Sequence, residues 1–167
     1  MTPDIRRSTV QDTDGIIALY KAAAASGGLS RKPDEITHAY VGGFLKQAVE
    51  AGLSLVAVRD GVIIGEIHGW PMPQSQFAHV FGDITIAVHP QAQGQGAGRA
   101  MFKGLIAEIE TVLPHIRRIE LGCRESNARA IALYESLGFV VEGRLKNRIY
   151  DEAGFYEDDL AMALLVR

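Results

Sequence analysis

The chain has a single cysteine, no long hydrophobic run and no excess of basic charge, and each lack removes a class of protein. Cys123 has no second cysteine with which to form an internal disulfide, and no Cys/His cluster indicates a metal site. No segment approaches the roughly 18 uninterrupted apolar residues of a membrane-spanning helix, and the N-terminus lacks the apolar core of a signal peptide. We therefore expect a soluble, cytoplasmic protein that binds no metal and no membrane.

The charge balance argues against a nucleic-acid partner. The 167 residues include 17 Lys and Arg against 20 Asp and Glu, a formal net charge of -3, whereas nucleic-acid-binding domains usually carry a basic surface. Apolar residues make up 47% and charged residues 22%, which is close to the average of globular proteins. We expect one domain over residues 1–167, because the chain has no repeat, linker or low-complexity tract.

Hydrophobic periodicity and turn residues predict seven strands and four helices. The expected strands are residues 5–8, 54–59, 62–70, 78–88, 118–124, 140–150 and 155–166, the last two flanking a turn at 151–154. The first helix opens at a capping box, Thr9-x-x-Asp12, and stops near Gly27. The others are expected at residues 33–51, 96–112 and 127–137.

Several local features sharpen these expectations. The first helix has an apolar face of Ile16, Leu19, Tyr20 and Ala23, and the third has one of Met101, Leu105, Ile109 and Val112. Asp60-Gly61 predicts a two-residue hairpin turn. Gly42-Gly43 predicts a break or a close contact in the second helix. Ser126 is expected to cap the fourth helix, and Gly138-Phe139 to end it.

A glycine-rich loop between a strand and a helix is the most informative segment. Gly94, Gly96 and Gly98 allow a ligand to approach the backbone closely, and the first amides of the following helix have no acceptor within it. The helix end also carries the equivalent of about +0.5 charge, so the loop suits an anion such as a pyrophosphate. The alternative is that these glycines serve only tight packing.

Two nucleotide-binding motifs fail on spacing. In the dinucleotide fingerprint G-x-G-x-x-G, the third glycine would fall on Arg99 or on Met101. A Walker loop needs Gly before Lys, and the chain has the reverse order, Lys103-Gly104. Neither a dinucleotide nor nucleotide phosphoryl transfer is therefore indicated.

The loop does fit Gln93-x-x-Gly96-x-Gly98, and in this it resembles the Q/R-x-x-G-x-G/A acetyl-CoA loop of the GNAT acetyltransferase superfamily. Residues 127–139, NARAIALYESLGF, resemble a second segment of that family, N-x-x-A-x-x-L-Y-x-x-x-G-F. Together the two motifs cover about residues 80–143. The resemblance implies the GNAT fold of the α/β (α+β) class, with a mixed, mostly antiparallel sheet of about six or seven strands, about four helices, and a splay between strands 4 and 5.

The resemblance also implies acetyl-CoA as co-substrate and assigns its contacts. In the family the matching asparagine contacts the pantetheine arm, and backbone groups of the fourth strand hold pantetheine, with the amide of Val88 as the candidate that polarises the thioester carbonyl. The implied cofactor-binding residues are Ile86, Ala87, Val88, Gln93, Gly94, Gln95, Gly96, Ala97, Gly98, Arg99, Asn127, Ala130 and Tyr134.

Acetyl transfer to an amine also needs an acid for the leaving thiolate and a base for the ammonium group. By resemblance Tyr134 is the acid, and Asp83 followed by Glu66 are the candidate bases. Each carboxylate is equally explained as a solvated charge at a strand end. His79 and His89 are further candidates, although a lone loop histidine is usually structural.

The resulting prediction is an acetyl-CoA-dependent N-acetyltransferase that acts on the primary amine of a small molecule. The C-terminal segment, residues 143–162, resembles a bacterial branch that includes amino-acid N-acetyltransferases, which favours a free L-amino acid or a related amine. A protein or peptide N-acetyltransferase and a non-catalytic acyl-CoA-binding sensor are the alternatives. A homodimer is expected by analogy with the superfamily.

Overall fold

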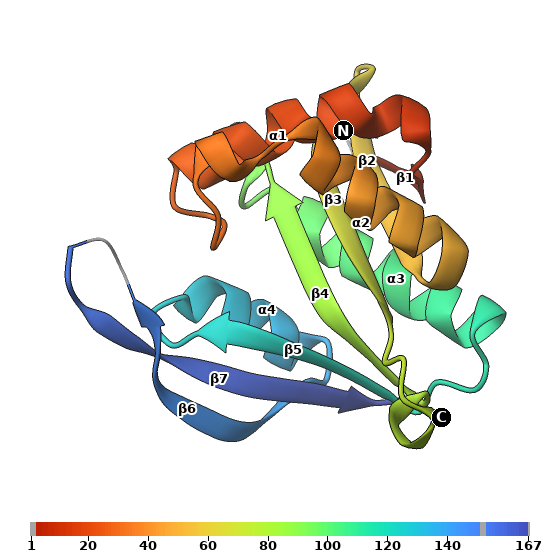
Figure 1. Cartoon of the computed structure of the whole chain (residues 1–167), viewed down its shortest axis with the longest axis vertical. Helices are drawn as coiled ribbons and strands as arrows, with labels where there is room; N and C mark the ends of the chain where they lie inside the picture. The colour runs from red at the N-terminus through yellow and green to blue at the C-terminus, as the bar shows by residue number, and fades with distance from the viewer. Residues whose placement is uncertain (1–2, 151–152, 167) are drawn as a thin grey trace. The chain divides into compact units, whose positions relative to one another are not determined.

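The strands of the protein form a seven-stranded sheet in the order β1-β2-β3-β4-β5-β7-β6 in a computed structural model that describes residues 3–150 and 153–166 (Figure 1). The strands are β1 (Asp4–Arg7), β2 (Leu53–Arg59), β3 (Val62–Pro71), β4 (Val80–Val88), β5 (Arg118–Arg124), β6 (Val140–Tyr150) and β7 (Tyr156–Leu165). The helices are α1 (Thr13–Ala25), α2 (His38–Ala51), α3 (Ala97–Val112) and α4 (Ala128–Ser136). β4 and β5 pair in parallel, whereas β1-β2, β2-β3, β5-β7 and β7-β6 are antiparallel. The predicted mixed α/β fold class is confirmed.

The chain divides into two compact units. Unit 1 consists of Met1–Trp70 and Ile84–Leu113, and unit 2 of Pro71–Asp83 and Pro114–Arg167. The parallel ladder pairs Val80 with Arg118 and Phe81 with Ile119, and in the described part of unit 2 it goes no further along β4. One domain over residues 1–167 stays a prediction.

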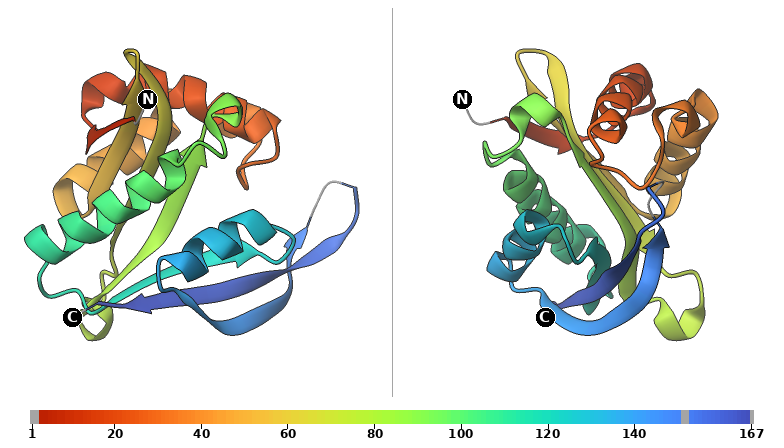
Figure 2. Two further views of the ribbon diagram at one scale, coloured as in Figure 1. Left: turned by 180° about the vertical axis from the view of Figure 1, so that it is seen from behind. Right: turned by 90° about the vertical axis from the view of Figure 1, so that its left-hand side faces the viewer.

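Within unit 1, helices cover both faces of the strands, with α3 on one side and α1 and α2 on the other (Figure 2). The α3 side chains Met101, Phe102, Leu105 and Ile109 have no exposed surface, and the helix packs against β2. The expectation that Val112 belongs to this face is wrong, because its side chain is 44% exposed. Val112 is the last residue of the helix, and the buried stripe ends one turn earlier.

The first helix is confirmed in its buried face but begins later than expected. Ile16, Leu19, Tyr20 and Ala23 are all buried. The capping box of Thr9 and Asp12 is present, but it opens a 3-10 turn (Val10–Asp12), after which α1 starts.

The second helix differs from the expectation at two points. Pro33–Glu35 forms a separate 3-10 turn, and α2 begins at His38 because the hydroxyl of Thr37 accepts a hydrogen bond from the amide of Tyr40 at 3.1 Å. The helix runs through Gly42-Gly43 without a break, and a Cβ at either glycine would meet no atom within 4 Å outside the local helix backbone. The core side chains around them, such as Phe44 and Leu45, hold the helix in place.

The β2-β3 hairpin contains the predicted turn and a bulge. Asp60 and Gly61 have φ of 51° and 76°, as a two-residue turn of this kind requires. Further along, Ala57 pairs with Gly65 and Val58 with Ile63, so Ile64 is one extra residue on β3.

The bulge determines which β3 side chains face which helices. A Cβ at Gly65 would lie 2.6 Å from Cε of Met101, so the absence of a side chain at Gly65 allows α3 to approach closely. Because side chains alternate along a strand, Glu66 and His68 point to the opposite face, toward α1 and α2. Their contacts with Tyr20 of α1 and Phe44 of α2 agree with this direction.

Unit 2 contains β5, β7 and β6 with α4. Asn127, not Ser126 as expected, caps α4, because its side-chain oxygen accepts from the amide of Ala130 at 3.1 Å. The helix end is confirmed: Gly138 has φ of 96°, and Phe139 is buried. The predicted turn before β7 includes residues 151 and 152, which lie outside the described residues. In the ranges described, no helix has the length and apolar character needed to cross a membrane, and no group of three His, Cys, Asp or Glu side chains is placed to hold a metal ion.

The buried face of α3 generates a stability prediction. Leu105→Ala removes a fully buried side chain and leaves a cavity, so we expect it to lower the free energy of unfolding by about 2–5 kcal/mol. Val112→Ala on the same helix should change it by less than about 0.5 kcal/mol because the side chain is exposed. Urea unfolding of both variants provides the measurement. Equal losses would contradict the assignment of the buried stripe.

Candidate functional site

The loop between β4 and α3 has the backbone geometry of an anion-binding turn. Gly94 and Gly96 have φ of 78° and 86°, in the region that favours glycine, and Gly96 is the residue that caps α3. Its carbonyl accepts the first helical hydrogen bond, from the amide of Ala100 at 3.0 Å. The amides at positions 97–99 therefore have no acceptor within the helix. The side chain of Ala97 is buried and holds this end of the helix in the core of unit 1.

Side chains brace this loop from within unit 1. The side-chain Nε2 of Gln95 donates to the carbonyl of Gln91 at 2.7 Å, and Nη1 of Arg59 on β2 donates to the side-chain oxygen of Gln95 at 2.6 Å. Gln93 reaches the carbonyl of Val88 at 3.4 Å. Nε of Arg59 is buried and has no hydrogen-bond partner among the described residues. The loop is thus preformed and has a guanidinium group beside it.

Asn127, the cap of α4, lies in unit 2, seven positions before Tyr134. Asn127 is exposed, and its side-chain oxygen is engaged by the amide of Ala130. Its side-chain NH2 group, the donor of that amide, is not used in this cap. Asn127 and Ala130 are therefore in direct contact at the start of the helix.

Tyr134 is buried near the C-terminal end of α4. Its ring lies 6.0 Å from that of Phe139, and only 7% of the residue is exposed. Burial, with a smaller contribution from the charge of Cys123, raises the pKa of the Tyr134 phenol far above its ordinary value. Burial also raises the pKa of the Cys123 thiol to about 11, with added contributions from Asp159 and Glu157. Both groups are therefore protonated at neutral pH.

Asp83 lies at an unusual point of β4. Its φ is 50°, which is uncommon for a residue with a side chain, and it follows the end of the short ladder with β5. Asp83 is exposed. An irregular backbone of this kind is frequently found at functional sites.

Glu66, the second predicted base, is in a different environment. It has no exposed surface and accepts hydrogen bonds from the hydroxyl of Tyr20 at 2.5 Å and from that of Ser54 at 2.6 Å. Nδ1 of His68 lies 3.1 and 3.2 Å from its two oxygens. Any part that Glu66 takes in proton transfer must therefore run through a neighbour.

The sequence analysis missed the partners of Glu66. Tyr20 was assigned only to the apolar face of α1, and His68 was not singled out. One signal was available: Glu66 and His68 alternate with apolar residues on a strand, which indicates that both face the same way. No local sequence signal indicates that Ser54 would contact Glu66. None indicates that Arg59 would contact Gln95 of the glycine loop.

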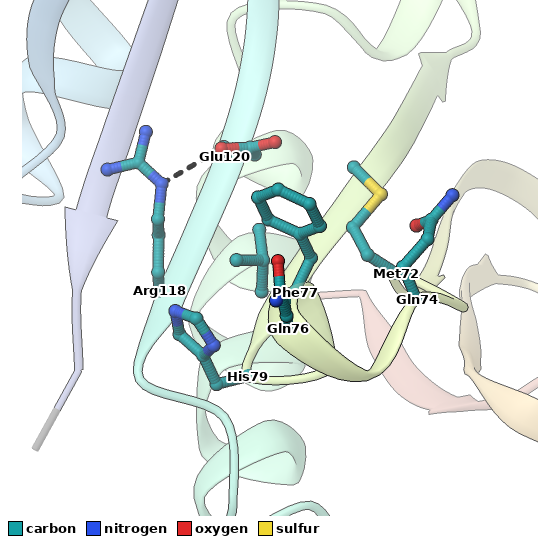
Figure 3. A pocket seen from close by; sticks show the side chains of 8 residues that line it. Met72, Gln74, Gln76, Phe77, His79, Arg118 and Glu120 are labelled. Atoms are coloured by element: carbon teal, nitrogen blue, oxygen red, sulfur yellow. Dashed lines mark hydrogen bonds and ion pairs between the residues drawn. The ribbon is translucent and has the colours of Figure 1, made fainter.

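A surface pocket of about 580 Å³ lies in unit 2 and is distinct from these residues (Figure 3). Its lining consists of Met72, Gln74, Gln76, Phe77, His79, Val80, Arg118 and Glu120. Arg118 forms an ion pair with Glu120 at 2.9 Å and a second ion pair with Glu142 at 2.5 Å. Of the sequence candidates only His79, an alternative base, takes part in it. His89, the other alternative, accepts a bond from the amide of Gln91 at 3.3 Å.

The structure thus brings predicted residues together within each unit. Residues 93–99 form the turn and the first residues of α3 in unit 1, and Asn127 caps α4, which contains Ala130 and Tyr134, in unit 2. Ile86 and Ala87 lie on β4, and Ala87 belongs to the core cluster that includes Tyr20 and Phe44.

The chain is similar in sequence to known acetyltransferases. The sequence profile of the Acetyltransferase (GNAT) family matches residues 16–139. A [ribosomal protein bS18]-alanine N-acetyltransferase of Salmonella typhimurium strain LT2 is 46% identical over 81 residues, 48% of this chain and 53% of that protein. An L-amino acid N-acyltransferase of Escherichia coli strain K12 is 31% identical over 93 residues, 54% of this chain and 52% of that protein. The chain thus spans about half the length of these curated relatives.

One solved structure extends the likeness to nearly the whole chain. The crystal structure of a ribosomal-protein-alanine N-acetyltransferase from Brucella melitensis superposes with a TM-score of 0.86 at 26% identity, covering 98% of this chain and 99% of that one.

The buried carboxylate generates a stability prediction. Glu66→Gln replaces one acceptor oxygen by an NH2 group that faces existing donors, so we expect the free energy of unfolding to fall by about 1–3 kcal/mol. Glu50→Gln is the matched control: that side chain is 62% exposed and should cost less than about 0.5 kcal/mol. The measurement is urea unfolding at neutral pH. A Glu66→Gln variant as stable as the control would show that the carboxylate does not hold these donors.

Proposed function

Since the chain belongs to the GNAT family of acetyltransferases, we propose that it transfers an acetyl group from acetyl-CoA to the primary amine of a small molecule. The observation that carries this proposal is the preformed turn before α3, where Gly94 and Gly96 are left-handed and the first helical amides have no acceptor within the helix, an arrangement that suits a pyrophosphate. Acetyl-CoA contains such a group and supplies an acetyl group activated as a thioester.

Three groups of residues would contact this co-substrate. The amides at positions 97–99 would hold the pyrophosphate, with the charge of Arg59 beside the loop. The backbone of Ile86, Ala87 and Val88 would hold the pantetheine arm, and the amide of Val88 would polarise the carbonyl. Asn127 and Ala130 at the start of α4 complete the proposed contacts.

Tyr134 is the proposed acid. Departure of the thiolate needs a proton, and a phenol whose pKa is raised by burial keeps its proton through the neutral and mildly alkaline range. Because the pKa of the Tyr134 phenol is raised far above neutral, ionisation of Tyr134 should not slow the reaction at physiological pH. Of the two carboxylates predicted as bases, Asp83 is exposed and Glu66 is fully buried.

The acceptor is proposed to be a free L-amino acid or a related amine. The likeness to an L-amino acid N-acyltransferase supports this class. The α-amine of a protein N-terminus is the second candidate, favoured by the relatives that acetylate a ribosomal protein alanine. Release of the thiol of coenzyme A, measured separately with L-amino acids, polyamines and short peptides, distinguishes these two acceptor classes. A homodimer and a cytoplasmic location stay predictions.

Gly96 offers a test of the loop with a close control. Gly96→Ala and Gly61→Ala each place a side chain at a left-handed φ, of 86° and 76°, where it would meet no atom within 4 Å. Both should therefore lose about 1 kcal/mol of stability. Because the Gly96 variant also displaces the loop amides, it alone should bind acetyl-CoA at least about tenfold more weakly in calorimetry, a change of roughly 1.4 kcal/mol. Equal affinities of the two variants would argue against the loop as the cofactor site.

Tyr134→Phe tests the proposed acid. It keeps the ring but removes the proton donor, so kcat should fall by about 100-fold while the affinity for acetyl-CoA changes little. Tyr150→Phe, at a tyrosine that is 61% exposed, should behave as wild type. Thiol release and calorimetry give the two quantities. A Tyr134→Phe variant with unchanged kcat would remove the residue from the mechanism.

A further inference from the structure

The hydrogen bonds around Glu66 determine which nitrogen of His68 carries a proton. A carboxylate only accepts, and Tyr20 and Ser54 already donate one hydroxyl to each of its oxygens. His68 Nδ1 lies within 3.2 Å of both oxygens, so it must also be a donor. In the neutral ring, Nδ1 therefore carries the proton and Nε2 carries the lone pair.

The ring of His68 is held in one orientation. Phe44 stacks on it at a centroid distance of 4.0 Å and an interplanar angle of 14°, and Trp70 stacks at 5.5 Å and 18°. Glu66 binds the Nδ1 edge of the ring, and His68 is only 3% exposed. No hydrogen bond from the described part of the chain reaches Nε2. The lone-pair edge is therefore the one left for a ligand.

The cluster of Glu66, His68, Tyr20 and Ser54 contains a carboxylate but no Lys or Arg. A buried carboxylate is costly unless it is paired, and the described contacts of Glu66 include no Lys or Arg. Tyr20 stays a neutral donor because burial, followed by the charge of Glu66, raises its pKa. The titratable groups that face His68 are thus Glu66 on β3 and Tyr20 on α1, with Tyr40 of α2 6.4 Å from the Tyr20 ring. A proton added at Nε2 would supply the missing positive charge.

We propose that His68 is the catalytic residue that accepts the proton of the acceptor ammonium group, and that Glu66 and Tyr20 are its positioning residues. This inference rests on the proposed acetyl transfer and replaces Asp83 as the base. It assigns a role to a buried polar cluster that packing alone does not require. Hydrophobic residues of similar size would fill the same space without burying a charge.

Acetyl transfer to an ammonium group begins with the loss of one proton. The N–H bond of R–NH3+ breaks, the proton goes to Nε2 of His68, and the electron pair stays on the amine nitrogen. That pair forms the C–N bond with the acetyl carbon, the C–S bond breaks, and its pair leaves with sulfur, which takes the phenolic proton of Tyr134. The new amide nitrogen loses one further proton, which restores the phenol through solvent, and His68 releases its proton to water.

His68→Gln gives the direct test, with the best acceptor from the amine panel and thiol release as the readout. Near pH 7 the amine is protonated, so kcat/KM should fall by about 100-fold. The deficit should shrink as the pH rises toward the pKa of the amine, because a neutral amine needs no proton acceptor. His115→Gln, at an exposed histidine, is the control and should follow the wild-type profile. A deficit that is the same at every pH would overturn the role of His68.

Two further measurements separate this role from a structural one. Tyr20→Phe keeps the ring and leaves His68 in place, and it should give a smaller loss, about tenfold, with the same pH signature. Nitrogen NMR of the wild type should show the Nδ1–H form of neutral His68, and the Nε2–H form would contradict the proposal. A wild type that binds no acetyl-CoA and acetylates no amine would instead remove the proposed function itself, whereas activity without the pH signature removes only His68.

Discussion

The position of helix α3 is fixed by packing in unit 1, and this packing holds the first amides of the helix in place. Four fully buried side chains, Met101, Phe102, Leu105 and Ile109, hold the helix against the strands. The bare Gly65 lets the helix approach β3, and the buried Ala97 fixes its N-terminal end. The donors proposed for a ligand anion are therefore already oriented, so little ordering of the loop would oppose binding.

The other face of the same strands is built around a charge. The one-residue bulge at Ile64 sends Glu66 and His68 toward α1 and α2, where Tyr20, Ser54 and the aromatic rings surround them. One strand thus presents a glycine to the helix that would hold the co-substrate and a carboxylate-histidine pair to the opposite layer. A proton acceptor and a helix-end anion site are two of the parts that acetyl transfer to an ammonium group needs.

Local signals predicted the parts of this arrangement that local chemistry determines. The turn at Asp60-Gly61, the glycine loop before α3 and the buried faces of α1 and α3 depend on neighbours a few residues away, and the structure has them where expected, apart from Val112. The glycine pair in α2 was misjudged because core packing by Phe44 and Leu45 outweighs the low helix propensity of glycine. The cap of α4 is Asn127 and not the predicted Ser126, because both residue types are good helix caps and lie next to each other. The Glu66 cluster and the brace from Arg59 join residues far apart in sequence, so no single segment contains the signal.

The central claim is transfer of an acetyl group from acetyl-CoA to an amine nitrogen. The most direct measurement incubates the purified protein with acetyl-CoA labelled in the acetyl group and a mixture of L-amino acids, polyamines and short peptides, and follows the label by mass spectrometry. Our interpretation predicts that the label appears as an amide on one amine class, with an equal amount of free coenzyme A. Thiol release without a labelled amide, or no consumption of acetyl-CoA at all, would contradict it.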